Sequence, residues 1–307
     1  ITPHCATDPA IELAERAARQ AVEEAGGDAS NLPTVIASSK GAVADVQKVP
    51  TGPVTAISAA LRDRMGIGPA RHVVAACASS LVGVHVARQW MAEESLDRVL
   101  VVSSEAALQP IFIHSYRRLG VLPRLTPDHY RARPLDQSRR GFVLTEVGAA
   151  ILLERNASRP LARLLDTAVA CEANDLIRTS ESRDALRYIA GRLLSDPIDL
   201  LHPHATGTVD NDESELSVYH DAAESIGDVY ACKGALGHGL GTSGLTALVL
   251  AVLAGRSQQR PPMRWLTQPL DMNLPLNASP QKRQIDRQAV FAAGFGGHVA
   301  GALLAAS

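Results

Sequence analysis

Apolar positions along this 307-residue chain follow two patterns that alternate from one end to the other. Short runs that are apolar at nearly every position, such as 98–103, are typical of strands inside a sheet that is covered on both faces. Runs in which apolar residues return every three or four positions, such as 9–25, predict amphipathic helices. The alternation of the two patterns predicts an α/β protein with covered sheets.

Turn-forming residues divide these runs and set the expected boundaries. Asp8 is a candidate N-cap for the first helix, and Gly26 with Gly27 provides its stop. The predicted helices are 9–25, 54–65, 79–94, 184–194, 211–223 and 245–253. The predicted strands are 33–38, 72–76, 98–103, 161–169, 198–201, 229–231, 289–293 and 299–305, with a further apolar run at 148–153. The segments 106–133 and 259–280 are expected to be irregular, the second of them on the surface, and the chain is expected to form two halves, 1–154 and 155–307.

Cys77 stands where a predicted strand meets a predicted helix. The first turn of a helix has unpaired N–H groups, and their partial positive charge favours a thiolate over a thiol. This position is typical of a nucleophile. A free cysteine is also often a small buried apolar residue, and the stretch by itself leaves that alternative open.

Composition and charge exclude several classes of protein. Thirty basic and 32 acidic side chains give a net charge of −2, so no strong field favours nucleic acid or an anionic membrane. The apolar runs are expected to be too short to span a bilayer, and the first residues lack the pattern of a secretion signal. The four cysteines lack the spacing of a zinc site or a disulfide framework, which favours a reducing cytoplasm: Cys5, Cys77, Cys171 and Cys232.

His204 and His238 also lie in predicted turns at strand ends. A thiolate with two imidazoles is suited to acyl transfer, because the thiolate forms a thioester and the imidazoles donate hydrogen bonds or carry protons. Two rival interpretations are weaker. The glycines of 239–244 match a dinucleotide-binding pattern, but no acidic residue follows before Asp271. His202 and His204 with Asp212 could hold a metal, but the sequence offers no third histidine nearby.

Five motifs, in this order, resemble the β-ketoacyl-acyl carrier protein synthases of the thiolase superfamily, specifically the elongating type with a Cys-His-His triad. The resemblance covers the chain from Ala6 to its C-terminus. The motifs are ACASS at 76–80, RPLD at 133–136 with RGFV at 140–143 and Glu146, HATGT at 204–208, Lys233 with LGH at 236–238, and GFGG at 294–297. The family's corresponding patterns are the nucleophile motif, RPFD…DGFV.GEG, HGTGT, K..LGH and GFGG.

The resemblance implies a thiolase-like fold of two similar α/β halves stacked in five αβαβα layers, with the active site where the halves meet. Cys77 would carry the acyl group, and His204 and His238 would promote decarboxylation of a malonyl thioester and stabilise the enolate. The backbone N–H groups of Cys77 and Phe295 would form the oxyanion hole, and Phe295 and Tyr116 would gate entry of the acyl chain. Thr206 and Thr208 would contact the phosphopantetheine arm. Lys233 would support the histidines electrostatically, with Asp212 and Glu215 as its candidate partners.

The implied partners are an acyl carrier protein and a second copy of the chain, or a second ketosynthase-like subunit in a heterodimer. No cofactor and no metal are implied, because the substrates arrive on phosphopantetheine. The carrier's acidic surface is expected to meet a basic patch, for which the candidates are Arg117, Arg118, Arg124, Arg131 and Arg133.

Several positions depart from the family pattern, and they leave two alternative functions open. Ala205 replaces a glycine, Thr145 and Val147 replace the glycines of GEG, and His298 replaces an asparagine. The family's first strand and a long segment after it have no counterpart here, so the chain is interpreted as a compact or N-terminally reduced member. The alternatives are an acyltransferase that passes the acyl group from Cys77 to a non-malonyl acceptor, and a partner subunit similar to a chain-length factor.

Overall fold

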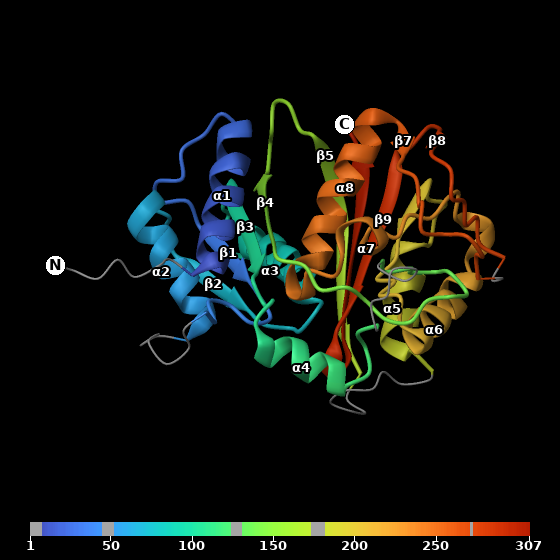
Figure 1. Cartoon of the computed structure of the whole chain (residues 1–307). Coiled ribbons are helices and arrows are strands. Elements are labelled where there is room, and N and C mark those ends of the chain that lie inside the picture. Colours follow the sequence, from blue (N-terminus) through green and yellow to red (C-terminus); the bar gives the residue numbers. More distant parts are fainter. Residues whose placement is uncertain (1–7, 45–51, 124–130, 173–181, 271–272) are drawn as a thin grey trace.

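The structure is a computed structural model that describes residues 8–44, 52–123, 131–172, 182–270 and 273–307. Two four-stranded sheets stand face to face with helices between and outside them (Figure 1). The first sheet has the order β2-β1-β3-β4, and its strands are β1 (Thr34–Ala37), β2 (Ala70–Val73), β3 (Arg98–Glu105) and β4 (Val147–Glu154). The second has the order β5-β10-β9-β6, and its strands are β5 (Ala162–Cys171), β6 (Leu200–His202), β9 (Arg287–Ala293) and β10 (His298–Ala306).

The strand directions differ between the two sheets. In the first sheet β1 is parallel to β2 and β3, and only β4 is antiparallel. In the second sheet β10 is antiparallel to β5 and β9, and β6 is parallel to β9. Two short strands, β7 (Gln259–Arg260) and β8 (Gln281–Lys282), form a separate ribbon.

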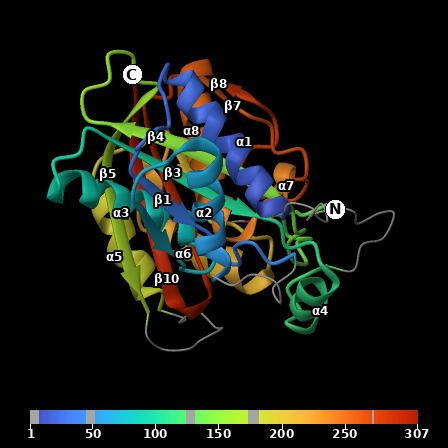
Figure 2. The same ribbon diagram turned by 90° about the vertical axis from the view of Figure 1, so that its left-hand side faces the viewer.

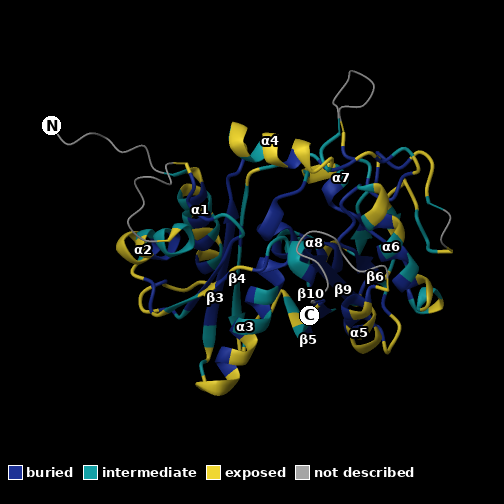
Figure 3. Ribbon diagram, turned by 90° about the horizontal axis from the view of Figure 1, so that it is seen from below, coloured by how far each residue is buried: buried dark blue, intermediate teal, exposed yellow. Residues whose placement is uncertain are grey.

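Helices complete the five layers that the family resemblance implies (Figure 3), and Figure 2 views these layers from the side of the first sheet. Helices α1 (Pro9–Glu24) and α2 (Pro53–Met65) cover the outer face of the first sheet, and α3 (Ser79–Glu93) and α8 (Ser243–Ser257) lie between the sheets. Helices α5 (Asp184–Leu193) and α6 (Val209–His220) cover the outer face of the second sheet. The shorter helical pieces are α4 (Pro110–Arg118), α7 (Lys233–Leu236), η2 (Ala223–Ser225), η3 (Leu240–Thr242) and η4 (Phe295–Gly297).

Local sequence explains how the outer helix α1 is placed. Asp8 accepts a hydrogen bond from the Ala10 N–H at 2.8 Å, which confirms it as the N-cap. The buried side chains of α1 are small and return at helical spacing, so the helix comes close to the sheet. Gly148 in β4 permits this approach, because a Cβ there would lie 2.3 Å from the carbonyl oxygen of Leu13.

The central helix α8 is apolar on nearly every side. The segment Leu240–Ser257 is long and apolar enough to cross a membrane by length and composition, which differs from the sequence expectation, but 61% of it is buried inside the protein. Its place between the two sheets explains this composition, because a helix covered on all sides needs no polar face. The Leu245 N–H donates to the Ser80 hydroxyl at 2.9 Å and thereby joins α8 to α3.

Several predicted boundaries are wrong. The segment 106–133 contains the helix α4. The strand predicted at 72–76 ends at Val73, the strand at 198–201 is moved to 200–202, and 229–231 forms only an isolated bridge to Leu201. The segment 259–280 is not simply surface chain, because Arg260 and Met263 are fully buried. Arg260 forms a 2.7 Å ion pair with Asp228, which is also buried, and this pair fixes the segment to the core.

Candidate active site

Cys77 lies on a tight turn between β2 and α3. Ala76, directly before it, has a φ of +46°, a conformation that costs a non-glycine residue about 1–2 kcal/mol. The Ser79 hydroxyl accepts the Ala75 N–H at 2.9 Å and donates to the Ala76 carbonyl at 2.6 Å, so it holds the turn in place. Backbone strain of this kind is frequent at functional sites.

The Cys77 side chain is half-buried beside a cluster of aromatic residues that includes Tyr116, Phe142 and Phe295. Burial raises the pKa of the Cys77 thiol to about 12. The charge of Lys233 opposes this rise in pKa, the carboxylate of Glu105 adds to it, and Lys40 opposes it. In the free site, desolvation of the charged form thus favours the thiol and opposes the effect expected of the helix N-terminus.

The two predicted histidines meet beside this cluster. The ring centroids of His204 and His238 are 5.5 Å apart with an angle of 76° between the rings. Phe142 connects them to Cys77, because its ring lies 4.7 Å from that of His238 and belongs to the same cluster as the cysteine. The loop after His238 also reaches the nucleophile turn, since a Cβ at Gly241 would lie 3.2 Å from the Ala76 carbonyl.

Both imidazoles are neutral near pH 7. Burial, followed by the positive charge of Lys233, lowers the pKa of each well below its usual value. His238 has its Nδ1 at 2.8 Å from the Ser243 hydroxyl, whereas the buried Nδ1 of His204 has no hydrogen-bond partner among the described residues. A neutral imidazole can donate a hydrogen bond to a developing negative charge, or accept a proton, without first losing a proton to solvent.

Backbone contacts of two carboxylates shape the HATGT loop. Glu215 accepts the N–H groups of His204 and Ala205 at 2.6 and 2.7 Å, and Asp212 accepts that of Gly207 at 2.9 Å. Burial raises the pKa of Asp212 to about 6. Ala205 has a φ of +36°, which the glycine of the family pattern adopts without strain.

Lys233 supports the same loop, but not through the predicted ion pairs. Its ammonium donates a hydrogen bond to the backbone carbonyl of His204. Within the described ranges, no ion pair joins Lys233 to Asp212 or Glu215. The prediction is wrong because the backbone N–H groups of the loop occupy both carboxylates.

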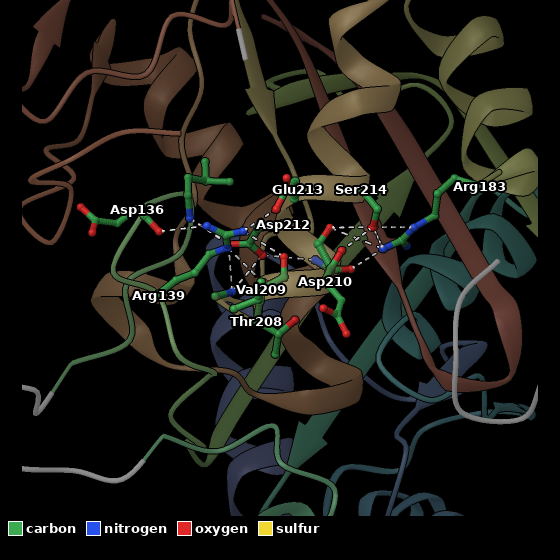
Figure 4. A network of polar contacts seen from close by, with 12 residues as sticks. Asp136, Arg139, Arg183, Thr208, Val209, Asp210, Asp212, Glu213 and Ser214 are labelled. Atoms are coloured by element: carbon green, nitrogen blue, oxygen red, sulfur yellow. Dashed lines mark hydrogen bonds and ion pairs between the residues drawn. The ribbon is translucent and has the colours of Figure 1, made fainter. Parts of the chain in front are cut away.

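Two buried arginines form hydrogen bonds with the N-terminal part of α6, the helix that carries Asp212 and Glu215 (Figure 4). Arg139 donates to the Val209 carbonyl at 3.0 Å and to the Glu213 carboxylate at 3.2 Å. Arg183, which is 1% exposed, donates to the Ser214 hydroxyl at 2.6 Å. Neither arginine was predicted from the sequence, because the motifs specify residue types but not which backbone and side-chain groups these arginines reach.

The GFGG turn lies directly against the nucleophile. A Cβ at Gly294 would be 2.8 Å from the Cys77 amide nitrogen, so only a glycine fits between the two segments. Gly296 and Gly297 have φ values of +78° and +77°, which favour glycine. This turn places Phe295 in the same cluster as Cys77. The two backbone N–H groups predicted to form the oxyanion hole belong to these two residues.

The other predicted site residues lie around the same centre. Tyr116, on α4, is 8% exposed, and its ring centroid is 5.8 Å from that of Phe142. The hydroxyl oxygens of Thr206 and Thr208 are 2.9 Å apart and share a hydrogen bond.

A cavity of about 170 Å³ lies beside the segment that carries His238, since Gly237 and Gly239 line it. Thr145, Val147, Lys233 and Ser243 are among the residues that line it. Val147 occupies the space that a side chain at position 239 would need, because its Cγ1 is 2.3 Å from a Cβ placed on Gly239. Thr145 and Val147 thus form one wall of this cavity where the family pattern has glycines.

The two rival interpretations have no support in the geometry. Gly239, Gly241 and Gly244 provide room for Val147, Glu105 and Leu81, respectively, and so serve packing. His202 Nε2 lies 3.1 Å from Gln288 Oε1, and in the described part of the chain no group of three metal-ligating side chains occurs.

Four further residues of the site were not predicted from the sequence. Phe142 and Ser243 contact His238, and Lys40 and Glu105 act electrostatically on Cys77. Phe142 had a sequence signal, since it lies inside a motif. Glu105 had a weaker one, as a carboxylate ending an apolar strand. No sequence pattern marks Lys40 or Ser243.

Comparison with known proteins matches both halves of the chain to one family. Residues 1–158 match the family model for the Beta-ketoacyl synthase, N-terminal domain, and residues 165–267 match that for the Beta-ketoacyl synthase, C-terminal domain. A 3-oxoacyl-acyl-carrier-protein synthase 2 of Mycobacterium leprae is 29% identical over 272 residues, which are 82% of this chain and 64% of that protein. The polyketide biosynthesis malonyl-ACP decarboxylase PksF of Bacillus subtilis is 27% identical over 253 residues, 76% of this chain and 60% of that protein. The chain thus spans less than two thirds of either relative.

Solved structures show the same thiolase-type fold. A type II polyketide ketosynthase, in complex with its acyl carrier protein, superposes with a TM-score of 0.85 at 19% identity and covers 98% of this chain and 85% of its own. The ishigamide ketosynthase/chain length factor has a TM-score of 0.84 at 21% identity and covers 100% of this chain and 84% of its own. With the family models matching both halves, and the motif cysteine and histidines gathered around one aromatic cluster, this chain belongs to the β-ketoacyl synthase family.

Proposed function

We propose that the chain is a β-ketoacyl synthase that extends an acyl group by decarboxylative condensation with a malonyl-carrier. In the first half-reaction, the Cys77 sulfur attacks the carbonyl carbon of an acyl thioester. The sulfur–carbon bond to the carrier breaks, and the thiol proton of Cys77 ends on the departing carrier thiol. Backbone N–H groups of Cys77 and Phe295 stabilise the tetrahedral oxyanion.

In the second half-reaction, malonyl-carrier loses carbon dioxide and becomes an enolate. His204 and His238 donate hydrogen bonds to the enolate oxygen, and the enolate carbon attacks the acyl-Cys77 thioester. The carbon–sulfur bond to Cys77 breaks, so the products are carbon dioxide, β-ketoacyl-carrier and the Cys77 thiolate, which takes up a proton from solvent. One observation carries this proposal: two buried imidazoles, whose ring centroids are 5.5 Å apart, lie beside the cluster that contains the cysteine.

Other residues are proposed to bind the substrates. Thr206 and Thr208 contact the phosphopantetheine arm, because their hydroxyls lie on the loop that presents His204. Tyr116 and Phe295 gate the acyl chain from opposite segments of the aromatic cluster. Lys233 with Asp212 and Glu215 positions the loop through its backbone. No cofactor or metal is invoked, and we propose a cytoplasmic location.

The proposed partners are an acyl carrier protein and a second copy of the chain. Support for the carrier comes from the ketosynthase of similar fold that was solved with its carrier, and from basic side chains near the site. Arg117 and Arg118 end α4, and Arg131 and Arg133 line a small depression with Arg140, whereas Arg124 lies outside the described residues. A heterodimer with a ketosynthase-like subunit is the alternative, since a ketosynthase/chain length factor pair has the same fold.

The test is intact-protein mass spectrometry with a panel of acyl-carrier thioesters, followed by malonyl-carrier. We expect a mass gain that maps to Cys77 and disappears on malonyl addition with release of a β-ketoacyl product. Cys77→Ala should form no adduct, and Cys171→Ala, which removes an exposed free cysteine, should still form it.

Two other results would redirect the assignment. An adduct that persists until an alcohol or amine acceptor is added would favour the acyltransferase alternative, which Ala205 and His298 motivate by their departure from the family pattern. A protein that never carries an acyl group on Cys77 and forms only a hetero-complex would favour the partner-subunit role.

A further inference from the structure

Lys40 lies on a loop that the structure holds firmly at both ends. The Ser38 hydroxyl donates to the Ser104 carbonyl at 2.8 Å and accepts the Gly41 N–H at 2.8 Å. Gly41 has a φ of +70°, and a Cβ there would lie 2.5 Å from the carbonyl carbon of Pro53, so the turn after Lys40 requires glycine. The lysine backbone is therefore fixed before any ligand binds.

The side chain of Lys40 extends to two aromatic residues of the cluster that contains Cys77. Its ammonium is 5.7 Å from the ring centroid of Phe112 and 5.9 Å from that of Tyr116, within the range of a cation–π contact. Both rings belong to the cluster against which Cys77 packs. The field of Lys40 reaches the nucleophile, because it lowers the pKa of the Cys77 thiol.

Glu105 lies next to this loop but does not pair with Lys40. One carboxylate oxygen of Glu105 accepts the Ser39 N–H, and the other is buried without a hydrogen-bond partner among the described residues. Neither Glu105 nor another acidic side chain in those ranges lies within the 4.0 Å of an ion pair with Lys40. Glu105 thus fixes the loop, and within the described ranges the half-buried ammonium of Lys40 has no ion-pair partner.

We propose that Lys40 makes the acyl pocket selective for acyl groups that end in a carboxylate, such as the half-thioesters of dicarboxylic acids. The inference rests on the proposed acylation of Cys77. A methyl-terminated chain would press against an ammonium and remove part of its water, whereas a carboxylate would replace that water with an ion pair. The aromatic edges around Lys40 would contact the methylene part of the same chain.

The experiment measures the initial rate at which Cys77 of the full chain is acylated by two pantetheine thioesters of equal length. One carries a hexanoyl group and the other an adipoyl group, which differs by its terminal carboxylate. We expect the wild type to prefer adipoyl by about 10- to 100-fold. We expect Lys40→Met to abolish or reverse this preference. We expect adipoyl to acylate Lys40→Glu more slowly than it acylates Lys40→Met.

Lys282→Met is the matched control, because it removes an exposed lysine on β8 and should leave the preference unchanged. Thermal unfolding of each variant shows that it is folded. Acylation of Cys77 with the same donor ratio in wild type and Lys40→Met would overturn the inference and leave the proposed function intact. A second result would also overturn it: an adipoyl-to-hexanoyl rate ratio equal to that of the wild type, together with slower decarboxylation of malonyl-carrier by acylated Lys40→Met. Lys40 would then bind the carboxylate of the malonyl group and not that of the acyl donor. Failure of every donor to acylate Cys77 would overturn both.

Discussion

His202 and His204 are two positions apart, yet they face different surroundings and do different work. His202 Nε2 contacts Gln288 Oε1 at 3.1 Å, a contact between two neighbouring strands of the second sheet. Burial lowers the pKa of His202 to about 4, although the hydrogen bond with Gln288 raises the pKa in part. His202 is therefore a structural histidine whose neutral form the fold selects.

This burial predicts a pH dependence of stability. Between pH 6.5 and about 4 the unfolded chain binds a proton at His202 and the folded chain does not, so the free energy of unfolding falls as the pH falls. The loss from this residue should reach about 3 kcal/mol. His202→Asn should flatten the pH dependence by that amount in urea unfolding. Equal slopes for wild type and His202→Asn would contradict the prediction.

At the scale of elements, loops rather than helices bring the reactive groups together. The loop that follows His238 packs on the nucleophile turn, and the close fit depends on Gly241. A Cβ at that position would lie 2.6 Å from a carboxylate oxygen of Glu105 and 2.7 Å from the Ser39 nitrogen. Because the Ser39 nitrogen belongs to the backbone, a change of side-chain rotamer cannot relieve this clash.

Gly241→Ala is therefore expected to lower the free energy of unfolding by about 1–3 kcal/mol and to slow acylation of Cys77. Gly191→Ala provides the contrast, because a Cβ at this position of α5 meets no atom within 4 Å. A helical alanine in place of glycine should stabilise the protein by about 0.5–1 kcal/mol. Urea unfolding measures both effects, and a Gly241→Ala variant as stable as Gly191→Ala would show that the loop yields easily.

At the scale of the whole molecule, β2 is an outer strand of the first sheet, and it leads to the nucleophile. Val74, directly after β2, is 61% exposed. An outer strand with an exposed apolar residue is a natural site for pairing with another strand. This geometry supports the proposed dimer, with two copies joined along β2.

A charge in this edge should separate the two copies. We expect light scattering after size-exclusion chromatography to give a dimer for wild type and a monomer for Val74→Asp. Leu161→Asp, which places the same charge on a residue 46% exposed at another surface, should remain a dimer. A monomeric wild type at every concentration, or a dimeric Val74→Asp, would rule out pairing through this edge.

The sequence by itself determined the order of strands and helices in most of the chain and the identity of Cys77, His204 and His238. Helical spacing, caps such as Asp8 and motif spacing involve residues that are close along the chain, so their physical basis is visible in the sequence. The α/β class follows from the same pattern, whereas the five layers were implied by the family resemblance alone. The helix α4 was missed because its residues Pro110–Arg118 lie in a segment rich in turn and charged residues.

Only the tertiary structure decided the electrostatics of the site. The pKa of Cys77 depends on burial and on Lys233, Glu105 and Lys40, which come from segments far apart along the chain. The roles of Asp212 and Glu215 likewise depend on which backbone N–H groups they reach. Desolvation and charge act through space and not along the chain, so no local pattern reports them until the fold has brought these groups together.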